Sequence, residues 1–105
     1  MKVQHSARLF VFAVLLTTLA AASQVTVSVP YTISTFASGV AGTYFQPDSI
    51  AVLGNHIFIG YGNGVAKDGS DGKSSTIVEY ALNGDVVTTF SVVGHNDGLR
   101  VNPQT

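Results

Sequence analysis

The sequence repeats itself once, with a period of about 50 residues. Thr35-Phe36-Ala37-Ser38-Gly39 returns as Thr89-Phe90-Ser91-Val92-Val93-Gly94, and Ile50-Ala51-Val52 returns as Leu99-Arg100-Val101. Phe36 and Phe90 are 54 residues apart, and Ile50 and Leu99 are 49 residues apart. A period in this range is typical of proteins that repeat small antiparallel sheets around an axis. One whole unit and the beginning of a second are present, and a single sheet of this kind cannot cover its own two faces.

The residues within the unit predict four strands separated by turns. We expect strands over residues 49–53, 56–61, 76–81 and 86–92, with tight turns at Gly54-Asn55 and Asn83-Gly84. Asn-Gly favours a two-residue type I′ turn. Apolar side chains occupy both faces of residues 56–61, as in a sheet packed between two neighbours. We therefore expect an all-β fold, an incomplete β-propeller containing one four-stranded antiparallel blade and the start of the next at Leu99-Arg100-Val101.

The first 23 residues predict a secretory signal peptide. Lys2, His5 and Arg8 form a basic start, residues 9–19 are almost entirely apolar, and Ala20-Ala21-Ala22-Ser23 offers small side chains for cleavage. The apolar run covers only residues 9–22, which is shorter than the roughly 20 residues that a membrane-spanning helix needs. We expect cleavage, no stable membrane anchor after it, and a secreted or periplasmic location.

The next segment, residues 24–34, alternates between apolar and other residues. Val25, Val27, Val29, Tyr31 and Ile33 fall on one side of an extended chain. Pro30 lacks a backbone donor, which favours the edge of a sheet. We expect this strand to join the last blade and close the propeller ring, so that residues 24–105 form the N-terminal part of the propeller.

Charge and cysteine content restrict the partners and the size of the core. After residue 23, three basic side chains stand against six acidic ones, a net charge of −3. Nucleic acid is an unsuitable partner because binding it depends on clustered Lys and Arg. The chain has no cysteine, so disulfides cannot compensate for the thin core of a small exported domain. We therefore interpret the chain as a fragment of a longer protein, or as a subunit that associates with others.

Several short motifs follow one another in a fixed order. They are Pro47, Ile50-Ala51-Val52, Gly54-Asn55 with Ile57-Phe58-Ile59, Ile77-Val78-Glu79-Tyr80, and Asn83-Gly84 before Phe90. This order resembles the NHL repeat and related secreted six- or seven-bladed β-propellers over residues 35–101. Ser49 replaces the usual Gly, Leu53 stands where Asp is common, and the loop 62–75 is longer than typical. The resemblance implies a propeller but carries no catalytic residue with it, since related propellers include binding proteins as well as lyases and lactonases with an axial metal.

The candidate site residues are Asp48, His95 and Asp97. His95 and Asp97 lie where we expect the chain to cross from an outer strand to the innermost strand of the next blade. His and Asp can bind a divalent metal or transfer protons, so these two are candidate catalytic residues and metal ligands. Asp48 occupies the comparable place in the earlier unit and is a candidate metal ligand. The alternative is a plain turn over Asn96-Asp97-Gly98, with Asp97 bonded to nearby amides.

The long loop between the second and third expected strands offers a weaker pattern. Asp68 and Glu79 match positions one and twelve of a calcium-binding loop, but Gly72 and Lys73 fail positions five and six. We expect a surface loop without calcium. Geometry places this loop, residues 39–48 and residues 94–98 at the same end of the sheet. His56 has no evident partner and is expected to be an ordinary strand residue.

The sequence thus favours an exported binding or scaffold module for a protein or small-molecule ligand. The alternative is part of a propeller enzyme, a lyase or lactonase with a divalent metal near His95 and Asp97. A divalent metal in the complete propeller is the one cofactor that the sequence suggests.

Overall fold

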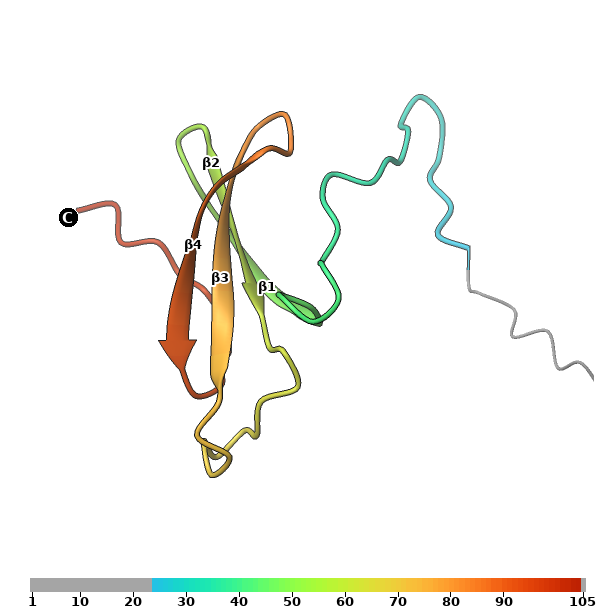
Figure 1. Cartoon of the computed structure of the whole chain (residues 1–105). Coiled ribbons are helices and arrows are strands. Elements are labelled where there is room, and N and C mark those ends of the chain that lie inside the picture. Colours follow the sequence, from blue (N-terminus) through green and yellow to red (C-terminus); the bar gives the residue numbers. More distant parts are fainter. Residues whose placement is uncertain (1–23, 105) are drawn as a thin grey trace, which may run out of the picture. The chain divides into compact units, whose positions relative to one another are not determined.

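A computed structural model describes residues 24–104, and these belong to two units, residues 24–32 and residues 33–104. The predicted signal peptide lies outside the described residues. Within residues 24–104 the regular secondary structure consists of strands (Figure 1). None of these residues belongs to a helix that could span a lipid bilayer.

The second unit is built on one four-stranded sheet. Its strands are β1 (Pro47–Leu53), β2 (His56–Tyr61), β3 (Ser74–Ala81) and β4 (Val86–Val93). They follow one another in the order β1-β2-β3-β4, and each pair is antiparallel. The all-β class and the four antiparallel strands are confirmed, and each observed strand begins and ends within two residues of the expected bounds.

The two tight turns, between β1 and β2 and between β3 and β4, differ in conformation. Leu53 pairs with His56 across Gly54-Asn55, and Gly54 has a φ of 57°, which a residue with a side chain rarely adopts. The expected type I′ turn at Asn83-Gly84 is wrong. There only Gly84 has a positive φ, its amide donates to the carbonyl of Ala81, and the β3–β4 register shifts after Glu79. This is the longer hairpin loop with a bulge, in which glycine alone takes the left-handed conformation.

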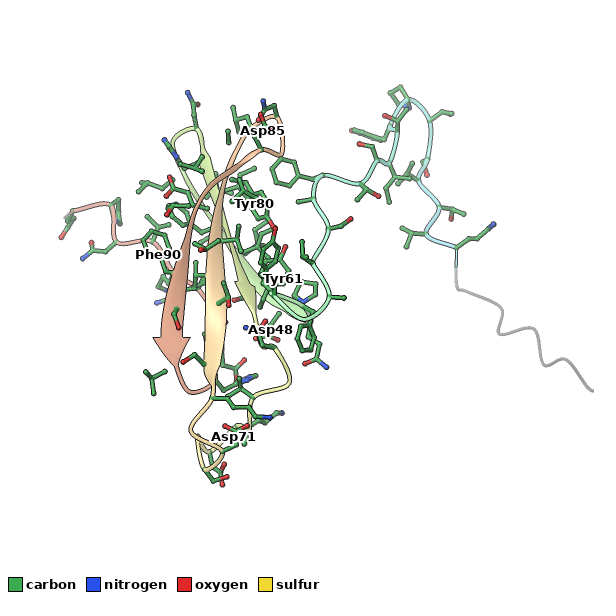
Figure 2. The ribbon with its side chains drawn as sticks, viewed as in Figure 1. Asp48, Tyr61, Asp71, Tyr80, Asp85 and Phe90 are labelled. Atoms are coloured by element: carbon green, nitrogen blue, oxygen red, sulfur yellow. The ribbon has the colours of Figure 1, made fainter. Side chains whose placement is uncertain are left out.

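The register divides the side chains of the sheet between two faces. Residues directly opposite each other on antiparallel strands point to the same side. We call the side with Ala51, Phe58, Ile77 and Phe90 face A. Face B is the opposite side and carries Ile50, Val52, Ile57, Ile59, Tyr61, Val78 and Tyr80. Figure 2 shows Phe90 on the side of the sheet opposite to Tyr61 and Tyr80.

The core lies on face B, under the chain that precedes β1. Tyr61, Val78 and Tyr80 are fully buried, with Ala37 and Tyr44 packed against them. The ring of Phe36 meets that of Tyr80 edge-on at 5.8 Å, and the ring of Tyr44 lies 5.0 Å from that of Tyr61. The backbone bonds between Val40 and Tyr44 close a tight turn that holds this covering segment, residues 36–45, in shape.

Face A is approached by the chain that follows β4. Leu99 and Val101 line a groove with Ala51, Phe58, Ile77 and Phe90. Residues 99–101 were expected to form the first strand of a second unit, and they do not form a strand in this structure. A strand needs a ladder partner, and none of the strands within residues 24–104 pairs with them.

Residues 24–34, which were expected to be the strand that closes the propeller ring, form no strand with the sheet described here. These residues belong to no sheet, and the amide of Tyr31 donates to the carbonyl of Ser28 at 3.0 Å in a turn around Val29-Pro30. Alternation alone marks a segment that could become a strand, whereas forming one requires an edge to pair with. Among the described residues, no such edge is paired with this segment.

A candidate metal-binding site

Three connections meet at the end of the sheet where β1 and β3 begin and β2 and β4 end. Gly62 donates to the carbonyl of Gln46 and Asn63 to that of Phe45, while Gly94 donates to the carbonyl of Lys73. The side chain of Asn63 adds bonds to the amide of Phe45 and the hydroxyl of Thr76. The residues 39–48, 62–75 and 94–98 therefore share one end, as the sequence predicts.

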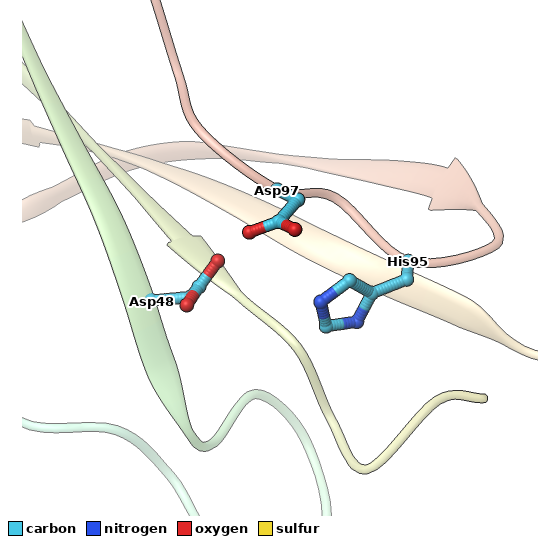
Figure 3. A group of neighbouring side chains, drawn as sticks. All are labelled: Asp48, His95 and Asp97. Atoms are coloured by element: carbon cyan, nitrogen blue, oxygen red, sulfur yellow. The ribbon is translucent and has the colours of Figure 1, made fainter. Parts of the chain in front are cut away.

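Asp48 lies on a bulge in the first strand. Pro47 pairs with Tyr61 and Ser49 with Gly60, so Asp48 has no opposite residue on β2. A bulge of this kind bends the strand and re-aims the extra side chain. The carboxylate of Asp48 points from β1 toward Asp97 and His95 and is exposed to solvent (Figure 3).

His95 and Asp97 are placed by the chain that leaves β4. Gly94 has a φ of 83°, which turns the chain across the end of β3. Asn96 is buried, and its side-chain nitrogen donates to the carbonyls of Tyr61 at 3.5 Å and Thr76 at 3.4 Å. Asn96 thus attaches the centre of this short connection to β2 and β3, with His95 and Asp97 on either side of it.

The three sequence candidates come together in the structure. One possible ligand atom from each of Asp48, His95 and Asp97 lies within 4.8 Å of the other two (Figure 3). The two carboxylates are exposed and the imidazole is half-buried. Nδ1 of His95 is buried without a hydrogen-bond partner among the described residues. Asn96 makes the anchoring bonds of this connection, and Asp97 faces Asp48 and His95.

The donor set suits a divalent cation. Metal–ligand bonds of about 2.0–2.6 Å hold two ligands of one ion no more than about 5 Å apart. The three side chains already lie within that range, and one imidazole with two carboxylates is a normal set for zinc or a similar ion. Three protein ligands also leave a coordination position for water or substrate, as catalytic sites require.

The acidic loop between β2 and β3 uses its carboxylates locally. The amides of Ala66 and Lys73 donate to Asp71, and the amide of Ser70 donates to Asp68. The bond from Ala66, followed by that from Lys73, lowers the pKa of Asp71, and the bonds from Ser70 lower that of Asp68. These carboxylates stabilise turns of the loop, which agrees with the expectation of a surface loop.

Two polar pairs were missed by sequence reasoning. Nδ1 of His56 lies 2.6 Å from Oε1 of Glu79 across β2 and β3 on face A. The hydroxyls of Tyr61 and Tyr80 share a buried hydrogen bond of 2.7 Å. Both pairs depend on the register between β2 and β3. Working out which side chains of the two strands lie on the same face of the sheet would have been the signal to find them.

Comparisons with known proteins identify no family or relative for this chain. No protein-family model matches the chain, and neither a curated protein nor a solved structure matches it.

Proposed function

We propose that this chain is an exported β-propeller blade that acts as a binding or scaffold module. The two-sided apolar character of its sheet supports this most directly. Face B is covered by the segment that precedes β1, and face A is approached by the segment that follows β4. Apolar side chains still remain exposed on both faces, including Ile50 on face B and Phe90 on face A. A blade stacked between neighbours requires this arrangement.

Features of the sequence support a location and a class of partner for this module. Residues 1–23 have the features of a cleaved signal, which supports a secreted or periplasmic location. The small negative charge favours a protein or small-molecule ligand over nucleic acid. The polar loops gathered beside Asp48, His95 and Asp97 form the surface where such a ligand would bind, since loops on a rigid sheet commonly carry binding residues.

The exported chain itself tests this proposal. We expect a mass that begins near residue 24, a β-rich circular dichroism spectrum, and fluorescence enhancement of the dye ANS by the uncovered faces at high dilution. A β-rich monomer that leaves ANS dark would contradict the proposal, because a blade without neighbours exposes apolar surface.

A second candidate function is metal-dependent catalysis of the lyase or lactonase type. The convergence of Asp48, His95 and Asp97 within 4.8 Å favours it. A divalent ion bound there would polarise a carbonyl oxygen or lower the pKa of a bound water. The chain's own contribution is to hold the ion through these three side chains.

Calorimetric titration with zinc tests this second candidate. We expect one zinc ion per chain. His95→Ala should reduce the affinity for zinc about tenfold or more, because the carboxylates of Asp48 and Asp97 alone bind the ion weakly. His56→Ala is the matched control, because His56 is also a partly exposed histidine but pairs with Glu79 away from the cluster. Equal zinc affinities of His95→Ala and the unaltered chain would exclude the site.

A further inference from the structure

We propose that face A of one chain binds face B of a second copy of the same chain. This inference rests on the proposed function, because it identifies what covers the apolar faces that the blade leaves exposed. It is carried by the sequence repeat together with the position of residues 99–101 in the structure.

The chain already shows which segment fits on face A. Leu99 and Val101 lie in the groove beside Ala51, Phe58, Ile77 and Phe90. Leu99 corresponds to Ile50, and Val101 to Val52, each 49 residues earlier in the sequence. Ile50 and Val52 are the face B side chains of β1. The groove on face A therefore accommodates the kind of side chains that face B presents at its first strand.

A second copy presents the same side chains in an exposed position. Ile50 is 62% exposed and Val52 is 58% exposed on face B, while Phe90 is 46% exposed on face A. The groove remains open beside Leu99 and Val101, so further apolar side chains can enter it. Burying these groups against one another removes apolar surface from water, which is the main favourable term in association.

Charge does not oppose this contact. The strand residues on face B include no ionisable group other than tyrosine, and the buried tyrosines there already bond to each other. On face A the strand charges are His56 and Glu79, which pair with each other. Arg100 also lines the groove, but it is exposed, and the stem of an arginine can lie along apolar surface while its guanidinium stays in water. Asp48 of β1 is exposed at the bulge where that strand begins. No lone charge of the strands would have to leave water at the interface, so the usual cost of burying ions is small.

The contact is heterologous, because two different surfaces meet. After the first contact one copy still has a free face B and the other a free face A, so association continues until a ring closes or a filament forms. This property distinguishes the proposal from a symmetric dimer, in which the same surface would be used twice.

Sedimentation of the exported chain with single and mixed variants tests the proposal. We expect concentration-dependent oligomers of the unaltered chain. Ile50→Asp, which damages face B, and Phe90→Asp, which damages face A, should each weaken self-association roughly tenfold or more. When the two variants are mixed, the intact face A of the first binds the intact face B of the second, and dimers form and grow no further.

Val29→Asp is the control, because Val29 is an exposed valine outside the sheet, and it should associate like the unaltered chain. Circular dichroism must show the same β content for all variants. A chain that stays monomeric at all concentrations but still enhances ANS fluorescence would overturn this inference and leave the blade proposal standing. Variants that fail to pair on mixing would also overturn it.

Discussion

The buried hydroxyls of Tyr61 and Tyr80 hold together the two central strands at the level of single residues. Both side chains are fully buried on face B, and their oxygens are 2.7 Å apart. Tyr80→Phe leaves the hydroxyl of Tyr61 buried without a hydrogen-bond partner. Because that hydroxyl has still been removed from water, the free energy of unfolding should fall by about 1–3 kcal/mol. Urea denaturation measures this loss.

The exposed Tyr31 supplies the matched control. Tyr31→Phe should change the free energy of unfolding by less than about 0.5 kcal/mol, as is usual at the surface. A Tyr80→Phe variant as stable as the unaltered chain would show that the hydroxyl pair contributes nothing.

Alkaline pH provides a second reading of the same pair. Burial of Tyr80, and then its bond to Tyr61, raises the pKa of its hydroxyl above the ordinary value of 10.0. In the unfolded chain the hydroxyl of Tyr80 ionises near pH 10, whereas in the folded chain it stays protonated to higher pH. Its contribution to the free energy of unfolding is therefore complete below pH 10 and is lost as the pH rises above it. Denaturation midpoints should fall above pH 10 more steeply in the unaltered chain than in Tyr80→Phe.

Among the elements, the close approach of β2 to the connection after β4 depends on Gly60. A Cβ at this position would lie 2.5 Å from Oδ1 of Asn96 and 2.7 Å from Oγ of Ser49. Gly60→Ala must therefore push Asn96 away from β2 and β3, and His95 and Asp97 move with it. Overpacking of this kind costs about 1–3 kcal/mol, and it should also weaken zinc binding.

Thermal unfolding and zinc titration of Gly60→Ala check both effects. Thr88→Ala, at an exposed position of β4, should alter neither. If Gly60→Ala lost stability but bound zinc as tightly as before, Asn96 would not position the cluster.

The strands could be predicted from the sequence because their signals are local. Period-two alternation and the glycine at Gly54 act over a few residues, and the observed strands agree with them. The meeting of Asp48 with Asp97 could also be anticipated, since the two lie 49 residues apart at the same place in the repeat. Each of these features needs no knowledge of which strand pairs with which.

Features that depend on register could not be predicted in the same way. The bulge after Glu79 changes the turn that Asn83-Gly84 adopts, and it is set by the pairing of β3 with β4. The anchoring of Asn96 and the pair of His56 with Glu79 arise from contacts between distant segments. The alternation of residues 24–34 predicts a strand, but no sheet edge among the described residues pairs with this segment.

For the whole molecule, these contacts predict an uneven distribution of stability. β2 and β3 are paired on both edges, and the fully buried Tyr61, Val78 and Tyr80 lie on them. β1 and β4 each have one unpaired edge within the described residues, and residues 24–32 belong to no sheet. Local opening is easiest where few buried contacts hold the backbone.

Amide hydrogen exchange of the exported chain, followed by NMR, should reproduce that order. We expect the slowest exchange at Val78 and Tyr80, and exchange close to that of an unfolded peptide at Val25 and Val27. In β4 the protected amides should be those that donate to β3, since the others point away from the sheet. Slow exchange at Val25 and Val27 would mean that this segment pairs with a sheet edge after all. Dilution then identifies whose edge it is, because protection by a second copy would decline as the concentration falls, whereas protection within one chain would not.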